Sequence, residues 1–229
     1  METKYIAHRG FALKRMENTL DAFKYAAESS CYGIETDVHV TKDGEFVVFH
    51  DDSTLRLCRE EHIIEETNCD RLQELRINDT FNNSKVKIPT LKEYLAICKS
   101  GKKNAVIELK NPMLKEQIKS LVEQIRKEEY LNSTTFISFD LNNCIVLRDI
   151  LPCQAIQYIT ITYEEETLKL IADKKIDLDI EYTCLSKDRI KYCQNLGLKV
   201  NCWTLNDPEI AKHFEEAGID FITSNNLGV

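Results

Sequence analysis

The sequence predicts an α/β fold, a (β/α)8 TIM barrel, on three observations. Short apolar runs alternate with amphipathic segments, which is the rhythm of a parallel sheet covered by helices. One of these runs follows its predecessor after a turn that is too short for a parallel crossover, so it lies outside the barrel. Eight strand candidates then remain in 229 residues, the count of a small barrel. An open doubly wound sheet is the alternative that this pattern leaves.

The eight strand candidates are short runs rich in β-branched and aromatic residues. They lie at residues 5–7, 33–40, 105–110, 135–139, 155–160, 176–181, 199–204 and 221–224. Helical spacing of apolar residues appears between them, first over residues 17–29 and then after Pro89-Thr90. Residues 118–125 carry a further apolar helix face. Gly197 and Gly218 lie where two helices should stop before the next strand.

A hairpin and an insertion interrupt this alternation. Residues 46–50 read as a strand, and Thr41-Lys42-Asp43-Gly44 contains an Asp-Gly turn signal. We therefore expect this strand to run antiparallel to the preceding one. Residues 51–88 are polar and are predicted to be an insertion that replaces the helix after the second barrel strand. The whole chain, residues 1–229, is expected to form a single domain.

The composition limits the kinds of molecule that the protein is expected to bind and the compartment in which it is expected. Asp and Glu number 38 against 30 Lys and Arg, a formal net charge of -8 that disfavours nucleic acids and anionic membranes. To bind a small anionic substrate, the protein would need a site whose local charge is positive. The nine cysteines form no CxxC pair, which indicates neither a zinc site nor a disulfide framework, and fits a reducing compartment. No run is long enough for stable membrane insertion and no signal peptide is recognisable, so we expect a cytoplasmic protein. The oligomeric state is not indicated.

Acidic residues lie near the ends of the second and third barrel strands. Glu35 and Asp37 are two residues apart, so both carboxylates point to the same side of the strand, and Glu108 lies on the next barrel strand. Barrel active sites lie at the carboxyl ends of the strands. Converging carboxylates repel one another unless they bind a cation, and oxygen donors suit Mg²⁺, Ca²⁺ or Mn²⁺. A solvated strand face is the alternative for this pair.

Histidines and cations join the carboxylates. The first strand delivers His8 and Arg9 to the same end of the barrel, and Lys110 follows Glu108. Folding back around the hairpin brings His50 roughly opposite Glu35. A divalent metal with two cations stabilises added negative charge on phosphorus, while a histidine pair supplies acid and base, so phosphoryl chemistry is indicated.

Other residues of the same types have plainer interpretations. The remaining histidines, His39, His62 and His213, are expected to be structural or exposed. The alternating acids Asp177, Asp179 and Glu181 are expected to be solvated or to support the site from outside it. Glu108 and Lys110, taken alone, would make an ordinary ion pair.

Ordered motifs along the chain resemble the glycerophosphodiester phosphodiesterase family. The first group comprises HRG at 8–10, ENT at 17–19, ExDV at 35–38, TxDG at 41–44 and VVxHD at 47–51. The second comprises IPTLKEYL, VIELK, FISF, CWTLN and FITSN, in the family's order. The resemblance spans nearly the whole chain and implies a TIM barrel with a small insertion after the hairpin.

The resemblance implies roles for individual residues. His8 and His50 match the family's acid/base pair, and Arg9 and Lys110 its phosphate-binding cations. Glu17 matches a supporting residue of the site. The metal ligands would be Glu35, Asp37 and Glu108, holding Mg²⁺ or Ca²⁺. Trp203 would wall the glycerol side of the pocket, with a core aromatic as the alternative.

The implied reaction is hydrolysis of a small-molecule glycerophosphodiester to glycerol 3-phosphate and an alcohol, through a cyclic phosphate formed by the glycerol 2-hydroxyl. Two alternatives keep the fold: a lysophospholipase D, and a non-catalytic phosphodiester-binding barrel. The chain departs from the family pattern at Met16, where Pro is common, within residues 56–67 of the insertion, and in FITSN, which lacks the usual Thr-Asp. The departure in the insertion leaves the preferred alcohol open.

Overall fold

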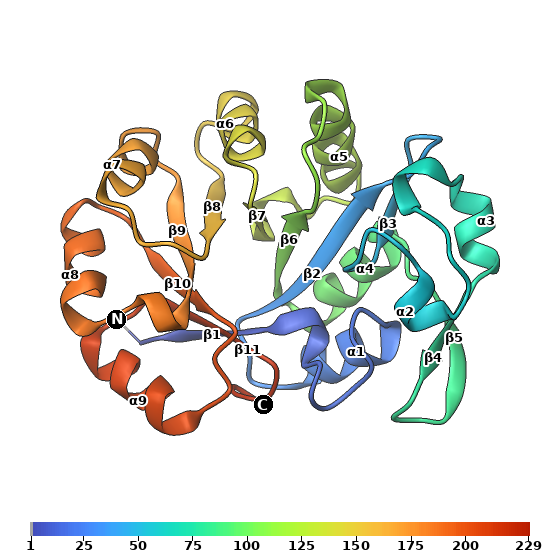
Figure 1. Ribbon diagram of the computed structural model, residues 1–229, viewed down its shortest axis with the longest axis horizontal. Helices are drawn as coiled ribbons and strands as arrows, with labels where there is room; N and C mark the ends of the chain where they lie inside the picture. Colours follow the sequence, from blue (N-terminus) through green and yellow to red (C-terminus); the bar gives the residue numbers. More distant parts are fainter. Residues whose placement is uncertain (1) are drawn as a thin grey trace.

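The first and last strands of the protein lie side by side and close a barrel. In the computed structural model, which describes residues 2–229, β1 (Lys4–Ala7) pairs in parallel with both β2 (Gly33–Val40) and β11 (Phe221–Ser224). The strands between them continue the parallel order as β6 (Asn104–Leu109), β7 (Thr134–Ser138), β8 (Ala155–Thr160), β9 (Asp177–Glu181) and β10 (Val200–Trp203). The predicted eight-stranded barrel is confirmed, and the open sheet is wrong (Figure 1).

Helices cover the outside of the barrel (Figure 1). They are α1 (Leu20–Glu28), α4 (Leu91–Gly101), α5 (Lys115–Lys127), α6 (Leu141–Ile150), α7 (Glu165–Asp173), α8 (Lys187–Asn195) and α9 (Pro208–Ala217). The first helix begins later than the predicted residue 17 because the Thr19 side chain accepts a hydrogen bond from the Ala22 amide and caps it. Residues 17 and 18 are thereby left free to serve the site. Gly218 ends α9 in the left-handed conformation, as predicted.

The hairpin leaves the barrel as the Asp-Gly turn predicts. Strand β3 (Phe46–Val48) runs antiparallel to β2, with Val38 opposite Val48 and Val40 opposite Phe46. This register, extended, places His50 opposite Thr36, beside Glu35. The return of His50 to the carboxylates is therefore built into the turn.

The insertion is an addition to the barrel and not a replacement for a helix, which corrects the prediction for residues 51–88. It contains α2 (Leu55–Cys58), η2 (Ile64–Glu66), α3 (Cys69–Glu74) and the hairpin of β4 (Arg76–Asp79) and β5 (Ser84–Lys87), while α4 supplies the helix. Ile64, Leu72 and Ile77 form a small buried core against Val47 and Phe49. These apolar residues are spaced too widely in a polar segment to be recognised as a core from the sequence.

Short 3-10 turns complete the chain at η1 (His8–Gly10), η3 (Leu131–Ser133) and η4 (Tyr182–Cys184). The interior of the barrel contains an apolar cluster of Ile6, Val106, Ile137 and Ile159. All nine cysteines are free. Among residues 2–229, no helix combines the length and apolar character needed to cross a bilayer.

Candidate active site

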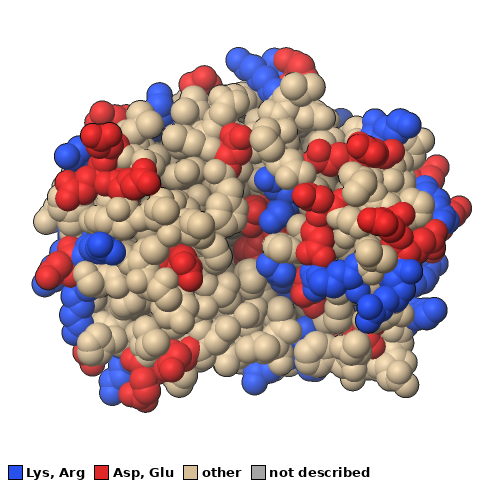
Figure 2. Space-filling view, viewed as in Figure 1, with Lys and Arg blue, Asp and Glu red and all other residues tan. Residues whose placement is uncertain are grey.

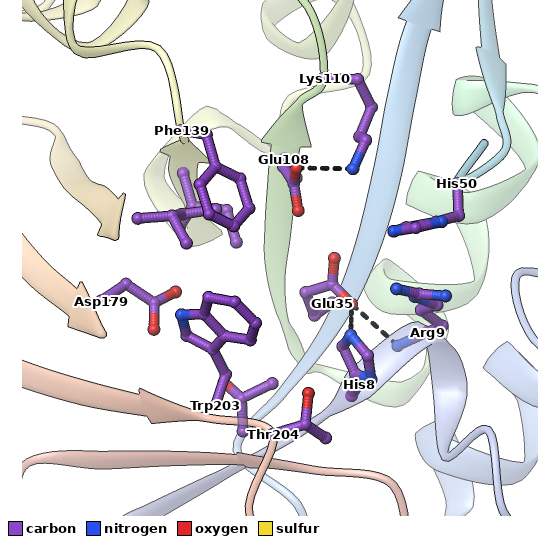
Figure 3. Close-up of a pocket in the computed structure, with 13 residues that line it drawn as sticks. His8, Arg9, Glu35, His50, Glu108, Lys110, Phe139, Asp179, Trp203 and Thr204 are labelled. Carbon is purple, nitrogen blue, oxygen red and sulfur yellow. Dashed lines mark hydrogen bonds and ion pairs between the residues drawn. The ribbon is translucent and has the colours of Figure 1, made fainter. Parts of the chain in front are cut away.

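A cavity of about 290 Å³ lies where the carboxyl ends of the barrel strands meet. Figure 2 shows it as a hollow near the centre of the face, with acidic atoms in its floor and basic atoms on one wall. Its lining includes seven of the nine predicted site residues: His8, Arg9, Glu35, His50, Glu108, Lys110 and Trp203. The other two, Asp37 and Glu17, contact this set from just behind it. The structure thus brings all nine together, and Figure 3 shows the seven that line the cavity.

A tight turn at the end of β1 presents His8 and Arg9. Arg9 and Gly10 have φ values of 49° and 79°, and a Cβ on Gly10 would lie 2.7 Å from the Ala22 backbone carbon, so only glycine fits there. The turn aims the Arg9 amide at Glu35, where it donates to Oε2 at 2.8 Å. His8 Nε2 lies 4.0 Å from the same oxygen.

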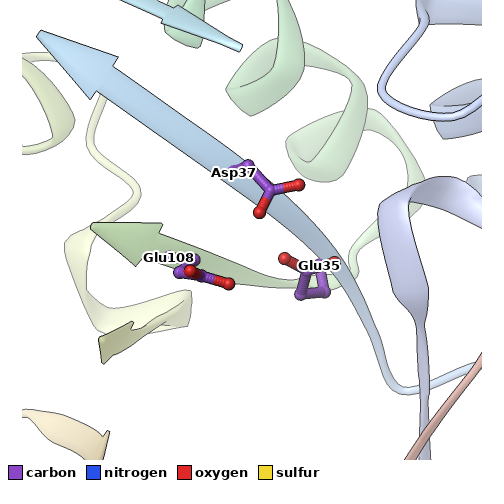
Figure 4. A group of neighbouring side chains, drawn as sticks. All are labelled: Glu35, Asp37 and Glu108. Carbon is purple, nitrogen blue, oxygen red and sulfur yellow. The ribbon is translucent and has the colours of Figure 1, made fainter. Parts of the chain in front are cut away.

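Three buried carboxylates form the floor of the cavity. Glu35, Asp37 and Glu108 each offer an oxygen, and these oxygens all lie within 4.8 Å of one another (Figure 4). The parallel register of β2 and β6 places Asp37 directly beside Glu108. All three side chains are buried, which excludes the solvated-face alternative.

The three carboxylates differ in their pKa values. Burial, with Asp37 and Glu108 nearby, raises the pKa of Glu35 well above its usual value. Burial and Asp37 also raise the pKa of Glu108 to about 7. Asp37 is buried as well, but Lys110 and Arg9 hold its pKa at about 2. The group cannot ionise fully without further positive charge. Three oxygen donors in this state suit a divalent cation such as Mg²⁺, Ca²⁺ or Mn²⁺.

Two cations flank the carboxylates. Lys110 Nζ lies 2.9 Å from Glu108 Oε1 and 3.4 Å from Asp37 Oδ1, and Arg9 Nε lies 3.4 Å from Asp37 Oδ2. Glu17 holds the Arg9 guanidinium at 3.0 Å. Both cations line the cavity, so each can also reach an anionic ligand there.

Each histidine is oriented through its Nδ1 atom. His8 Nδ1 lies 2.8 Å from Asn225 Oδ1, and His50 Nδ1 lies 2.7 Å from Asp51 Oδ1. Burial, and then Arg9, lower the pKa of His8 to about 4, so its ring is neutral near pH 7. A neutral His8 that donates its Nδ1–H to Asn225 leaves Nε2 free as a base.

Sequence reasoning did not assign Asn225 or Asn18 to the site. Asn18 is buried, and its side chain donates to Asp37 Oδ2 at 2.7 Å and accepts from the Thr36 hydroxyl at 2.8 Å. Asn18 could have been identified from the sequence because it lies within the ENT motif. Asn225 could have been identified because it ends FITSN, where the chain departs from the family pattern.

The insertion reaches the site through Arg56 of α2. Its guanidinium contacts Glu17 Oε1 at 2.7 Å and Asp51 Oδ2 at 2.6 Å. Glu17 holds Arg9 and Asp51 holds His50, so one side chain of the insertion braces two residues of the cavity.

The far wall of the cavity combines aromatic rings with one acid. Phe139 packs edge-on against Trp203, with ring centroids 5.5 Å apart. Asp179 is 2 % exposed and lines the same cavity, so its predicted place in the solvent or outside the site is wrong. Burial, and then Glu108, raise the pKa of Asp179 to about 8. Its inward direction follows from the period of two along β9, whose intervening residues Leu178 and Ile180 face the helices.

The other predicted structural residues lie away from the cavity lining. His39 is buried in β2 with Nε2 3.4 Å from the His50 carbonyl oxygen. His62 pairs with Glu60 on the insertion, and His213 is exposed on α9. Asp177 accepts a hydrogen bond from the Lys199 amide at the opposite end of β9.

Comparison with known proteins gives consistent matches. The family model "Glycerophosphoryl diester phosphodiesterase family" matches residues 8–229. A glycerophosphodiester phosphodiesterase of Caldanaerobacter subterraneus subsp. tengcongensis is 27% identical, covering 99% of this chain and 95% of the relative. The crystal structure of a glycerophosphodiester phosphodiesterase from Parabacteroides distasonis is 28% identical, with a TM-score of 0.85, covering 98% of this chain and 93% of that one.

A third match extends the fold similarity. A phosphodiesterase from Oleispira antarctica, whose structure is a complex with the product sn-glycerol-3-phosphate, is 24% identical with a TM-score of 0.88 and covers 98% of this chain and 93% of that one. The fold is therefore shared at low identity. With the family model matching nearly the full length, the chain belongs to the glycerophosphoryl diester phosphodiesterase family.

Proposed function

We propose that the protein hydrolyses glycerophosphodiesters to glycerol 3-phosphate and an alcohol with the help of a divalent cation. The observation that carries this proposal is the buried triad of Glu35, Asp37 and Glu108 at the strand ends, flanked by two cations and two histidines. Family membership supports the same reaction.

The triad would hold Mg²⁺, Ca²⁺ or Mn²⁺. If all three carboxylates were ionised without a bound ion, they would outweigh Arg9 and Lys110, and the net negative charge would repel a phosphodiester. Bound at the triad, a divalent ion supplies Lewis-acid stabilisation of charge on the phosphoryl oxygens. The local charge then becomes about +1 with neutral histidines, although the protein as a whole is acidic.

Arg9 and Lys110 would bind the phosphodiester anion. Both side chains are tied to carboxylates on one side and line the cavity on the other. Burial lowers the pKa of Lys110, but Asp37 and Glu108 raise it above its usual value, so it stays charged. A prepositioned cation needs little reorganisation as negative charge builds on phosphorus.

His8 and His50 would move the protons. One histidine accepts the proton of the glycerol 2-hydroxyl as its oxygen bonds to phosphorus, and the other protonates the head-group oxygen as its bond to phosphorus breaks. The product of this step is a cyclic phosphate. Water then opens the ring with the two roles exchanged. Asn225 and Asp51 orient the rings for both steps.

The remaining assignments concern surroundings. Trp203 would wall the glycerol side of the cavity, on the side away from His50 (Figure 3). The nine free thiols support a cytoplasmic location, and the net charge of -8 supports the expectation that the protein binds no nucleic acid.

Product release from a panel of substrates tests the proposal. The purified chain should release glycerol 3-phosphate from glycerophosphocholine or glycerophosphoethanolamine in the presence of Mg²⁺, Ca²⁺ or Mn²⁺. His8→Ala and His50→Ala should each lower kcat by about 10²- to 10⁴-fold, the contribution of a positioned proton-transfer group. His213→Ala, on the exposed face of α9, is the matched control and should keep full activity.

Adding lysophosphatidylcholine to this panel separates the two alternatives. Faster turnover of lysophosphatidylcholine than of glycerophosphocholine would assign the protein as a lysophospholipase D. Binding of the diesters without turnover, across all three ions, would assign a non-catalytic barrel.

A further inference from the structure

Two buried polar atoms without a hydrogen-bond partner lie in the far wall of the cavity. They are Oδ1 of Asp179 and Nε1 of the Trp203 indole. Both residues line the cavity, and in Figure 3 the nitrogen-bearing edge of Trp203 faces the Asp179 carboxylate. Since buried polar groups are nearly always paired in folded proteins, an unpaired donor and an unpaired acceptor in one cavity mark a place where a ligand group can bond.

The surrounding protein does not supply the missing partner. The neighbouring Asn201 amide lies close enough to lower the pKa of Asp179, but its hydrogen bonds go to Thr223 Oγ1 at 3.0 Å and to Gln157 Oε1 at 3.4 Å. No Lys or Arg among the described residues forms an ion pair with Asp179 within 4.0 Å. The two basic side chains of the cavity, Arg9 and Lys110, lie on the opposite wall and pair with the carboxylates of the floor.

The pair of atoms selects the chemistry of its ligand. An indole N–H can only donate, and a carboxyl oxygen that carries no proton can only accept, in the neutral acid as in the carboxylate. A hydroxyl group matches both, because it accepts from the indole and donates to the carboxylate. An ammonium group would satisfy the carboxylate but would leave the indole N–H without an acceptor.

We propose that Asp179 and Trp203 bind the terminal hydroxyl of the glycerol moiety and make the site specific for a glycerol that is not acylated at that position. This inference rests on the proposed function, since it takes the phosphate to lie at the opposite wall with Arg9 and Lys110. The glycerol 2-hydroxyl is needed at phosphorus, so the terminal hydroxyl is the group left to reach Asp179.

The assignment has a consequence for substrate choice. An acyl ester at the terminal oxygen removes the hydroxyl hydrogen that would bond to Asp179. It also adds bulk beside a buried wall of the cavity. Lysophospholipids acylated there therefore lose the contact that glycerophosphodiesters make. A site built to bond a hydroxyl rejects an analogue that lacks it more strongly than an apolar wall does.

Binding of two product analogues tests the inference without relying on turnover. The probes are glycerol 3-phosphate and propane-1,2-diol 1-phosphate, which lacks only the terminal hydroxyl, titrated calorimetrically in the presence of Ca²⁺. The wild type should bind glycerol 3-phosphate about 10- to 100-fold more tightly, because the analogue leaves two buried polar groups without a hydrogen-bond partner. Asp179→Ala should bind the two probes equally, and Trp203→Phe should lose part of the preference.

A control on the same strand and a folding measurement complete the test. Glu181→Ala removes a carboxylate outside the cavity lining and should keep the full preference. Asp179→Ala should melt at or above the wild-type temperature, since it removes an unpaired buried carboxylate. Equal binding of both probes by the wild type, or a preference retained by Asp179→Ala, would overturn the inference. A wild type that shows the preference but hydrolyses no diester would refute the proposed function alone.

Discussion

At the scale of single residues, side-chain amides set the state of the charged groups. Asn225 orients the His8 ring and by itself raises the pKa of His8, but burial and Arg9 outweigh this effect and keep the pKa low. Asn18 donates to Asp37 Oδ2, the oxygen that Arg9 also contacts. Both asparagines lie far in sequence from the groups that they contact. Alternation and turn signals report local structure, and therefore predicted the strand residues but not these partners.

Removing the Asn225 amide should slow catalysis. Asn225→Ala frees the His8 ring to rotate, so kcat should fall by about 10- to 100-fold while KM changes little. Steady-state hydrolysis of glycerophosphocholine measures both constants. Asn226→Ala is the matched control in the same loop, because no contact joins it to His8. Unchanged kcat in Asn225→Ala would show that His8 is held by other contacts.

Asp179 should make the metal-free protein less stable as pH rises. Its pKa is about 8 when folded and 3.8 as the unperturbed value, so between these pH values the folded state holds a proton that the unfolded state has released. Stability is then lost as pH rises through this window. The melting temperature of Asp179→Asn minus that of the wild type should grow from pH 5 to pH 8 and then level off. A difference independent of pH would contradict the raised pKa.

The acids of β9 also show a limit of sequence reasoning. Asp177, Asp179 and Glu181 alternate as they would on an exposed edge strand, and the pattern is the same on a strand of a closed barrel. Only the closure between β1 and β11 turns Asp179 inward to a cavity.

At the scale of elements, the insertion is coupled to the barrel through charged contacts. The turn at residues 41–44 was readable because Asp-Gly specifies a hairpin locally. The small core of the insertion could not be predicted from the sequence, since its apolar residues come from separate short elements. Arg56 then connects this core to the site, bridging Glu17 and Asp51.

Arg56→Ala should lower kcat by about 10-fold, because Glu17 and Asp51 lose their common brace and Arg9 and His50 lose orientation. Unfolding free energy should change by only about 0.2–1 kcal/mol, as expected of exposed ion pairs. Hydrolysis rates and urea unfolding measure the two effects. Arg59→Ala, one turn away and exposed, should match the wild type in both. Equal rates for the two variants would refute the bracing role.

At the scale of the whole molecule, acidic composition and an anion site coexist. The net charge of -8 belongs to the whole chain, whereas the basic atoms of the cavity wall come from two strand-end residues (Figure 2). Composition alone predicts that large polyanions are repelled. It carries no information on a cavity whose sign depends on a bound ion.

Ion binding should stabilise the fold. A ligand at 100 times its Kd adds about 2.7 kcal/mol, which for a chain of this size is a rise in Tm of about 5–10 °C. Scanning fluorimetry with saturating Mg²⁺, Ca²⁺ or Mn²⁺ checks this. Asp37→Asn should abolish the shift, and Glu181→Gln, outside the triad, should keep it. A full shift in Asp37→Asn would place the ion elsewhere.

The most direct test of the ion's role at the strand-end triad is reactivation of chelated enzyme. Protein stripped with EDTA should release no glycerol 3-phosphate from glycerophosphocholine, and adding back Mg²⁺, Ca²⁺ or Mn²⁺ should restore turnover to the wild type but not to Glu35→Gln. Full turnover by the stripped wild type, or restoration in Glu35→Gln equal to that of the wild type, would contradict a metal-dependent site built on Glu35, Asp37 and Glu108.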